Sequence, residues 1–168
     1  KTRQNIDEAS FKKAAEQIAS SKNVYIFGLG NSSSIAIDAA HKFMRAGISA
    51  VSYCDNHMQA IAASHLSEGD TAIGISHSGS SKDIVEALEI AAERGAETIC
   101  ITNHGKSPIV KKSSIALFTS SDETEYSILG LNSRIAALTI IDTLYACIIN
   151  SRGSEAASAI TRVESALK

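Results

Sequence analysis

The chain has 168 residues and a formal net charge of −2, with 44% hydrophobic and 20% charged residues. This length and composition fit one globular domain that buries about two-thirds of its unfolded surface. No window holds a dense cluster of lysine and arginine, so we do not expect this chain to bind nucleic acid by itself. It starts at Lys1 rather than methionine, which we interpret as a processed chain or a piece of a longer protein.

Apolar periodicity predicts helices and strands that alternate along the chain. Continuously apolar strands between helices are typical of a parallel sheet covered on both faces. We therefore predict a three-layer α/β sandwich with a five-stranded parallel sheet, of the flavodoxin-like or Rossmann-like kind. In chain order we expect a helix over 5–20, a strand over 23–28, a helix over 33–47, a strand over 48–53, a helix over 56–67, a strand over 71–76, a helix over 81–95, a strand over 96–102, a helical turn over 107–113, a strand over 114–120, and helices over about 126–150 and 153–167.

Small, hydroxyl-rich segments follow two of the predicted strands. GLGNSSS (28–34) comes after the first strand and SHSGSS (76–81) after the third. In open parallel sheets, ligands bind at the carboxyl ends of the strands. A helix start there offers unpaired N–H groups and a partial positive charge. The two loops predict an anion site that suits one phosphate monoester, although serine and asparagine also cap helices where no ligand binds.

Other sites with similar loops fit this sequence poorly. GLGNSS departs from the dinucleotide-binding fingerprint because Ser33 stands where glycine or alanine is needed, and no Gly-Lys-Ser/Thr of a P-loop is present. GISHSG has Ser78 where a nucleophile elbow needs glycine. Cys54 and His57 have a zinc-like spacing but no second pair. We expect neither a metal nor a cofactor.

These residues carry a family resemblance over about residues 20–150. VYIFGLGNSS, GDTAIGISHSGSSKDIVEAL and GAETICITNHGKSPI together resemble a sugar isomerase (SIS) domain, the phosphosugar-binding module, whose hallmark is a Ser-x-Ser-Gly-x-Ser/Thr loop. The resemblance implies an SIS-type five-stranded parallel sheet and a phosphosugar site. His77 departs from the pattern, since many relatives carry glutamine or another small polar residue there. The resemblance implies ligand binding by Ser32, Ser76, His77, Ser78 and Ser81. Our further candidates for ligand binding are Gly30, Asn31, Gly79 and Glu125.

A narrower resemblance concerns the segments DNHMQAIAASHL (55–66) and LNSRIAALTIIDTLY (131–145). Both are similar to the effector domain of RpiR-type transcriptional regulators, in which a helical linker joins an N-terminal helix-turn-helix domain to the phosphosugar domain. The resemblance implies a sensor of a phosphorylated sugar or amino sugar that controls carbohydrate metabolism genes. DNA would be bound only through a helix-turn-helix domain that is not in this chain. The implied division is a linker helix over 1–20, an SIS domain over 21–150, and a helix over 151–168 that packs on the domain or on its dimer partner.

Alternatives to a sensor remain open. An aldose–ketose isomerase needs a carboxylate to move a proton and a group to open the sugar ring, and Glu125 with His77 or His57 could supply them. In a binding domain Glu125 would contact sugar hydroxyls, or it is a solvated loop carboxylate. His57 and Gln59 are possible ligand or interface residues, or helix caps. An amino-sugar-phosphate lyase and an oligomerisation module are further alternatives, and His104 carries no functional signal.

Three further features bear on compartment and assembly. The three cysteines are widely spaced among apolar residues, which predicts buried free thiols in a reducing compartment. The apolar stretch 135–149 is too short and too charged to span a bilayer, so we expect a cytoplasmic protein. Arg134 and Asp142 are expected to form structural salt bridges. The mostly apolar helix around them predicts a homo-oligomer, a dimer or a tetramer.

Overall fold

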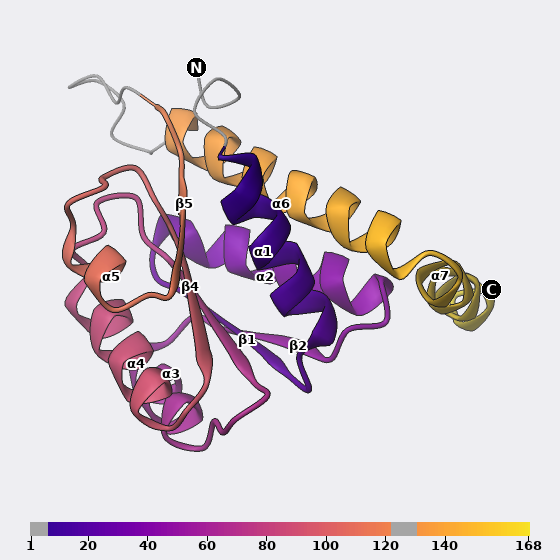
Figure 1. Cartoon of the computed structure of the whole chain (residues 1–168), viewed down its shortest axis with the longest axis horizontal. Coiled ribbons are helices and arrows are strands. Elements are labelled where there is room, and N and C mark those ends of the chain that lie inside the picture. Colours follow the sequence, from indigo (N-terminus) through magenta and orange to yellow (C-terminus); the bar gives the residue numbers. More distant parts are fainter. Residues whose placement is uncertain (1–6, 122–130) are drawn as a thin grey trace.

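The computed structural model describes residues 7–121 and 131–168 and confirms the predicted order of elements (Figure 1). The helices and strands begin and end within a few residues of the expected positions, and the start of the expected 126–150 helix lies partly outside the described residues. In chain order the elements are α1 (Glu8–Ser20), β1 (Val24–Gly28), α2 (Asn31–Arg45), β2 (Ala50–Tyr53), α3 (Asn56–Ser64), β3 (Thr71–Ile75), α4 (Lys82–Glu93), β4 (Glu97–Thr102), α5 (Pro108–Lys111), β5 (Ile115–Phe118), α6 (Leu131–Arg152) and α7 (Ser154–Ala166).

All five strands are parallel, and their order across the sheet is β2-β1-β3-β4-β5. The strand order therefore reverses between β1 and β3, which lie side by side although β2 separates them in the chain. Gly28 at the end of β1 is in register with Ile75 at the end of β3, and Ile75 with Ile101 of β4. The loops that leave these three strands consequently start at one edge of the sheet, where ligands bind in folds of this class.

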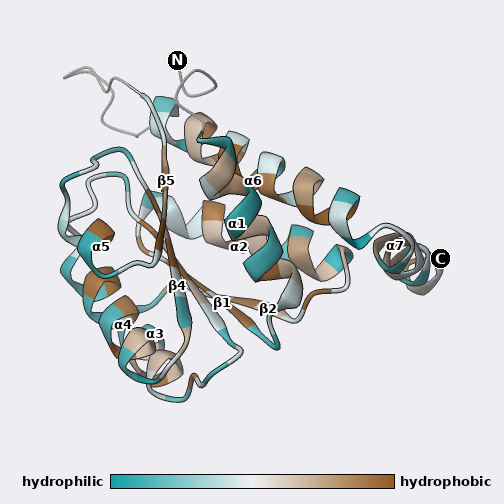
Figure 2. Ribbon diagram, in the orientation of Figure 1, coloured by the Kyte–Doolittle hydropathy of each residue, from teal (hydrophilic) through white to brown (hydrophobic). Residues whose placement is uncertain are grey.

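Helices cover both faces of the sheet and form two cores. One core contains α1, α2 and α6 and includes Phe43, Ile73 and Ile141; the other lies under α3, α4 and α5 and includes Phe27, Leu88 and Ile109. The ribbon coloured by hydropathy shows apolar strands between helices whose colours vary around their surfaces (Figure 2). This arrangement follows from the sequence, because strands buried on both faces must be continuously apolar.

The two terminal helices also bury apolar surface. Phe11 and Ile18 of α1 belong to the same core as α6 and β5, so the helix predicted as a linker contributes to the domain interior. At the other end, α7 buries Ala156 and Ala159, and a side chain at Gly47 would come within 2.8 Å of the Ala159 Cβ. The domain boundaries expected from the sequence remain predictions.

Helix α6 is long and apolar enough to cross a membrane by length and composition alone, over Asn132–Arg152. The prediction from the sequence concerned only the stretch 135–149, which is too short to span a bilayer. In the structure one face of this helix supplies Ile140, Leu144 and Ile148 to the core beneath it. A core helix of a globular protein satisfies the same length and composition criteria, and 33% of the apolar window of α6 is buried in the structure.

The predicted salt bridge of Asp142 has a specific partner. Its carboxylate lies 2.6 Å from the ammonium of Lys42 on α2, and the same ammonium contacts Asp38. The pair therefore ties α2 to α6. Arg134, which was expected to form a similar bridge, is half-buried near the start of the described part of α6.

The prediction of buried thiols is wrong for one of the three cysteines. Cys100 in β4 is buried and Cys147 in α6 is partly buried, but Cys54 is exposed because it follows the edge strand β2. None of the three forms a disulfide. Burial raises the pKa of the Cys100 thiol, which keeps it protonated and unreactive at neutral pH.

Candidate functional site

The first candidate loop turns sharply between β1 and α2. Gly30, the residue before α2, has a φ of +54°, which favours glycine. A Cβ at Gly28 would lie 2.5 Å from the carbonyl oxygen of Ser32, so only glycine allows the first turn of α2 to approach the strand end this closely. Asn31 is exposed and Ser32 is half-buried at the start of the helix. The loop thus presents the N-terminus of a 15-residue helix at the sheet edge.

The second candidate loop, residues 76–81, is called the serine loop below. Ser76 is buried, and its hydroxyl oxygen accepts a hydrogen bond from the Gly79 N–H at 3.1 Å and lies 3.1 Å from the Ser81 hydroxyl. Ser81 precedes α4, so this contact links both ends of the loop. Ser78 points the other way: it is exposed and accepts only a local bond from the Ser80 N–H at 3.2 Å. The loop therefore uses Ser76 and Ser81 to hold its shape and offers Ser78 outward.

Gly79 allows the serine loop to touch the segment that follows β4. Its φ is +66°, and a Cβ there would lie 2.1 Å from the Ser107 hydroxyl and 2.8 Å from that of Thr102. The Ile109 N–H donates to the Gly79 carbonyl at 3.0 Å. Glycine is required here for two reasons: its positive φ, and the absence of a Cβ that would overlap Ser107.

An open cavity of about 680 Å³ lies between the serine loop and the segment after β4. Among the described residues, the first loop contributes nothing to this lining, so the structure does not bring Ser32 and Ser78 to one cavity wall. Two loop serines form one side and the β4–α5 segment forms the other. The lining residues are Ser78, Ser80, Asn103, His104, Gly105, Lys106, Ser107 and Pro108.

His77 lies at the edge of this cavity, next to a histidine to which the sequence reasoning gave no role. The rings of His77 and His104 meet edge to face, with centroids 5.8 Å apart. The His77 carbonyl accepts hydrogen bonds from the Asn103 N–H at 3.0 Å and the Thr102 hydroxyl at 3.2 Å. These two bonds fix the backbone of His77 against the segment after β4.

A serine loop at the end of β3, beside a strand-order reversal, fits the resemblance in the sequence, and comparison with known families decides the matter. Residues 17–147 match the SIS domain. The chain belongs to this family. It is 44% identical over 133 residues to an uncharacterized HTH-type transcriptional regulator of Caldanaerobacter subterraneus, covering 79% of this chain and 47% of that protein. It is 31% identical over 166 residues to the HTH-type transcriptional regulator HexR of Escherichia coli, covering 99% of this chain and 57% of HexR.

A solved structure extends the likeness to the whole SIS fold. Vibrio vulnificus NanR, complexed with ManNAc-6P, superposes with a TM-score of 0.93 at 26% identity, over 99% of this chain and 62% of that one. This chain spans about half the length of the two curated regulators. The five-stranded parallel sheet is therefore that of an SIS domain.

Gln59 and His57 occupy different environments in this SIS domain. Gln59 is fully buried, and its amide nitrogen donates to the carbonyls of Tyr53 at 2.7 Å and Gly28 at 3.3 Å. It joins α3 to the ends of β1 and β2, and a ligand or interface role for it stays a prediction. His57 is exposed in the first turn of α3, where Asp55 provides the cap by accepting from the Met58 N–H.

The remaining predictions concern catalysis and metals. Glu125, the carboxylate expected to contact a sugar, lies outside the described residues. Within 7–121 and 131–168, no group of three or more His, Cys, Asp or Glu side chains is arranged to hold a metal ion. The lining of the serine-loop cavity in the same ranges contains no carboxylate.

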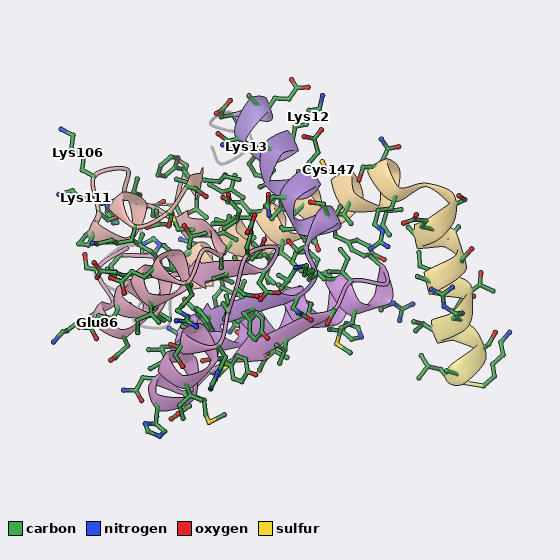
Figure 3. All side chains as sticks on the ribbon, turned by 60° about the horizontal axis from the view of Figure 1, so that its bottom comes forward. Lys12, Lys13, Glu86, Lys106, Lys111 and Cys147 are labelled. Atoms are coloured by element: carbon green, nitrogen blue, oxygen red, sulfur yellow. The ribbon has the colours of Figure 1, made fainter. Side chains whose placement is uncertain are left out.

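A second cavity of about 400 Å³ lies between α1 and α6, with Phe11, Ala15 and Cys147 in its lining. Figure 3 shows Lys12 and Cys147 in this region, to the right of Lys106 and Lys111. Among the described residues its lining comes from α1 and α6, without a strand end or the serine loop. The cavity beside the serine loop is the better candidate for a phosphorylated ligand.

The segment 103–107 forms one wall of the site, and none of its residues was among those predicted from the sequence. These residues follow β4, and β4 lies next to β3 in the sheet. The available signal was that polar residues follow both β3 and β4, which are neighbours in the sheet. It could be read only once the strand order was known.

Proposed function

We propose that this chain is the effector-binding part of a transcriptional regulator, that it senses a phosphorylated sugar or amino sugar, and that it controls carbohydrate metabolism genes. The observation that carries the proposal is the serine loop, which exposes Ser78 to an open cavity and ends at the first turn of α4. Hydroxyls and helix-end N–H groups suit one phosphate monoester. The regulators among its relatives, and the ManNAc-6P complex of NanR, support the same function.

The proposed signal is a shift between two arrangements of a homo-oligomer. Coupling of this kind requires a ligand that binds one arrangement better than the other. DNA would be bound by a helix-turn-helix domain outside this chain, as the resemblance to RpiR-type regulators implies. Free thiols and a role at DNA support a cytoplasmic location.

A thermal-shift panel tests the proposal. The panel contains ManNAc-6P, glucose 6-phosphate, fructose 6-phosphate and the same sugars without phosphate. A ligand at about 100 times its Kd stabilises by about 2.7 kcal/mol. For a domain of this size we expect a rise in Tm of roughly 5–10 °C with at least one sugar phosphate and none with its unphosphorylated form. The absence of a shift with every sugar phosphate at millimolar concentration contradicts the proposal.

We also propose that binding is not followed by turnover. The relatives described above are regulators, and an isomerase would need a base beside the reacting carbons. The test is to follow the bound sugar phosphate by NMR over hours. An unchanged ligand supports the sensor. Conversion of an aldose phosphate to its ketose, abolished by Glu125→Gln or His77→Gln, would establish a sugar-phosphate isomerase instead.

A further inference from the structure

Hydrogen bonds hold the β4–α5 segment firmly against the serine loop. The backbone of Asn103 and the side chain of Thr102 both donate to the His77 carbonyl, and the backbone of Ile109 donates to the Gly79 carbonyl. These bonds lie at both ends of the segment 103–108. The backbone of the residues between them is therefore placed relative to the serine loop before any ligand binds.

The far side of the segment is tied to β5 as well. The Asn103 side chain accepts from the Thr119 hydroxyl at 3.1 Å and from the Ser121 N–H at 3.0 Å. The Ser107 hydroxyl donates to the His104 carbonyl at 2.6 Å, which closes the turn that contains Gly105 and Lys106. Lys106 thus extends from a hydrogen-bonded turn, and its side chain is exposed.

Charge singles out Lys106 within this cavity. Among the described lining residues it is the one full positive charge, and none of them is a carboxylate. Two lysines outside the cavity lining have acidic partners: Lys82 pairs with Glu86 at 3.6 Å, and Lys112 pairs with Glu89. The serines of this loop offer a phosphate dianion only neutral donors. A cation on the opposite wall would complete the site electrostatically.

The position of Lys106 suits a residue that closes over its ligand. It is exposed, and Figure 3 shows it extending outward at the same end of the molecule as Lys111. A lysine carries a compact charge on four flexible carbons, so its ammonium can fold back over the cavity mouth after a ligand has entered. Until then the exposed charge attracts anions toward the cavity.

We propose that Lys106 binds the phosphate of the sugar phosphate held by Ser78, and so supplies the positive charge that the serine loop lacks. This inference rests on the proposed function, because it requires a phosphorylated ligand in the cavity beside the serine loop. Lys106 does not belong to the Ser-x-Ser-Gly-x-Ser/Thr pattern, and its role follows from its place in the cavity lining.

The experiment is isothermal titration of the wild-type chain, Lys106→Gln and Lys111→Gln with ManNAc-6P, glucose 6-phosphate and fructose 6-phosphate. Titrations are run at about 25 and about 200 mM salt, where screening of exposed charges differs strongly. Lys111→Gln is the matched control, since this exposed lysine lies on α5 outside the cavity lining. Melting temperatures without ligand show that each variant is folded.

For Lys106→Gln we expect Kd to rise about tenfold at low salt, a change of about 1.4 kcal/mol. We also expect it to lose most of the salt dependence of binding, while Lys111→Gln stays within about twofold of wild type. Equal Kd values and equal salt dependence for wild type and Lys106→Gln would overturn this inference alone. A wild-type chain that binds none of the three sugar phosphates would overturn the proposed function, and the inference with it.

Discussion

The hydroxyls of the serine loop divide into two groups, one turned inward and one turned outward. Ser76 is buried and bonds to Gly79 and Ser81, whereas Ser78 is exposed at the cavity. Removing an outward hydroxyl should change binding without changing the fold. Removing an inward one should change both, because a buried network loses a member.

We therefore expect Ser78→Ala to weaken sugar phosphate binding by about 1 kcal/mol, roughly fivefold, with an unchanged Tm. Ser76→Ala should weaken binding and also lower the free energy of unfolding by about 1–2 kcal/mol. Ser81→Ala should weaken binding with a smaller loss of stability. Titration calorimetry and urea unfolding measure the two effects, with Ser158→Ala on the exposed side of α7 as control. Wild-type affinity in both Ser78→Ala and Ser81→Ala would refute the role of this loop.

Gly79 offers a sharper test of how the two walls of the site meet. An alanine there has an unfavourable positive φ and would overlap the Ser107 hydroxyl. We expect Gly79→Ala to cost more than about 2 kcal/mol in urea unfolding and to abolish measurable sugar phosphate binding. Gly153→Ala is the control, since Gly153 has a φ of +48° and nothing within 4 Å of the added Cβ. It should cost about 1 kcal/mol and leave binding intact. Equal costs at both glycines would show that the contact with Ser107 does not matter.

At the scale of elements, contiguous sequence patterns predict the helices, the strands and the serine loop. They do not predict contacts between residues that are far apart in the chain. The apolar runs that form β1, β3 and β4 stand out in the sequence because both of their faces are buried. The serine loop could be predicted because its residues are contiguous. The buried amide of Gln59 could not, because a polar residue in the first turn of a helix is usually exposed. The contact of Gly79 with Ser107 depends on strand order, which periodicity does not contain.

The ion pair between Lys42 of α2 and Asp142 of α6 is another contact between elements that are far apart in the chain. Burial lowers the pKa of Lys42, but the hydrogen bonds that its ammonium donates to Asp142 and Asp38, with the negative charges of both carboxylates, outweigh burial and raise the pKa overall. A raised pKa means that the folded state holds the proton more tightly than the unfolded state does. The stabilisation is therefore complete below the unfolded value of about 10.4, and it is lost as pH rises through the folded pKa.

A double-mutant cycle with Lys42→Met and Asp142→Asn should give a coupling energy of about 0.5–1 kcal/mol in urea unfolding at neutral pH. The coupling should fall as pH rises through the raised pKa of Lys42, because the ammonium then loses its proton. The exposed pair Lys82 and Glu86 on α4 is the control and should couple by no more than about 0.5 kcal/mol. A coupling that stays constant into the alkaline range would mean that packing rather than charge joins the two helices.

At the scale of the whole molecule, the most exposed apolar side chains of α2 and α6 point to a partner surface on their side of the sheet. Ile37 and Met44 on α2 are 55% and 58% exposed, and Ile135 on the neighbouring α6 is 66% exposed. These helices cover the same face of the sheet (Figure 1). The sequence predicted an interface through the long apolar helix. The exposed residues suggest that α2 takes part in it.

We expect the chain to form a homodimer through this surface. Light scattering at tens of micromolar should give twice the chain mass of 17.7 kDa or a multiple of that dimer. Ile37→Asp combined with Met44→Asp should give the 17.7 kDa monomer, because two buried, unpaired carboxylates oppose association strongly. Met58→Asp is the control: Met58 is 44% exposed on α3, which covers the other face of the sheet. A wild-type chain that is monomeric, or a double variant that stays dimeric, would show that α2 is not the interface.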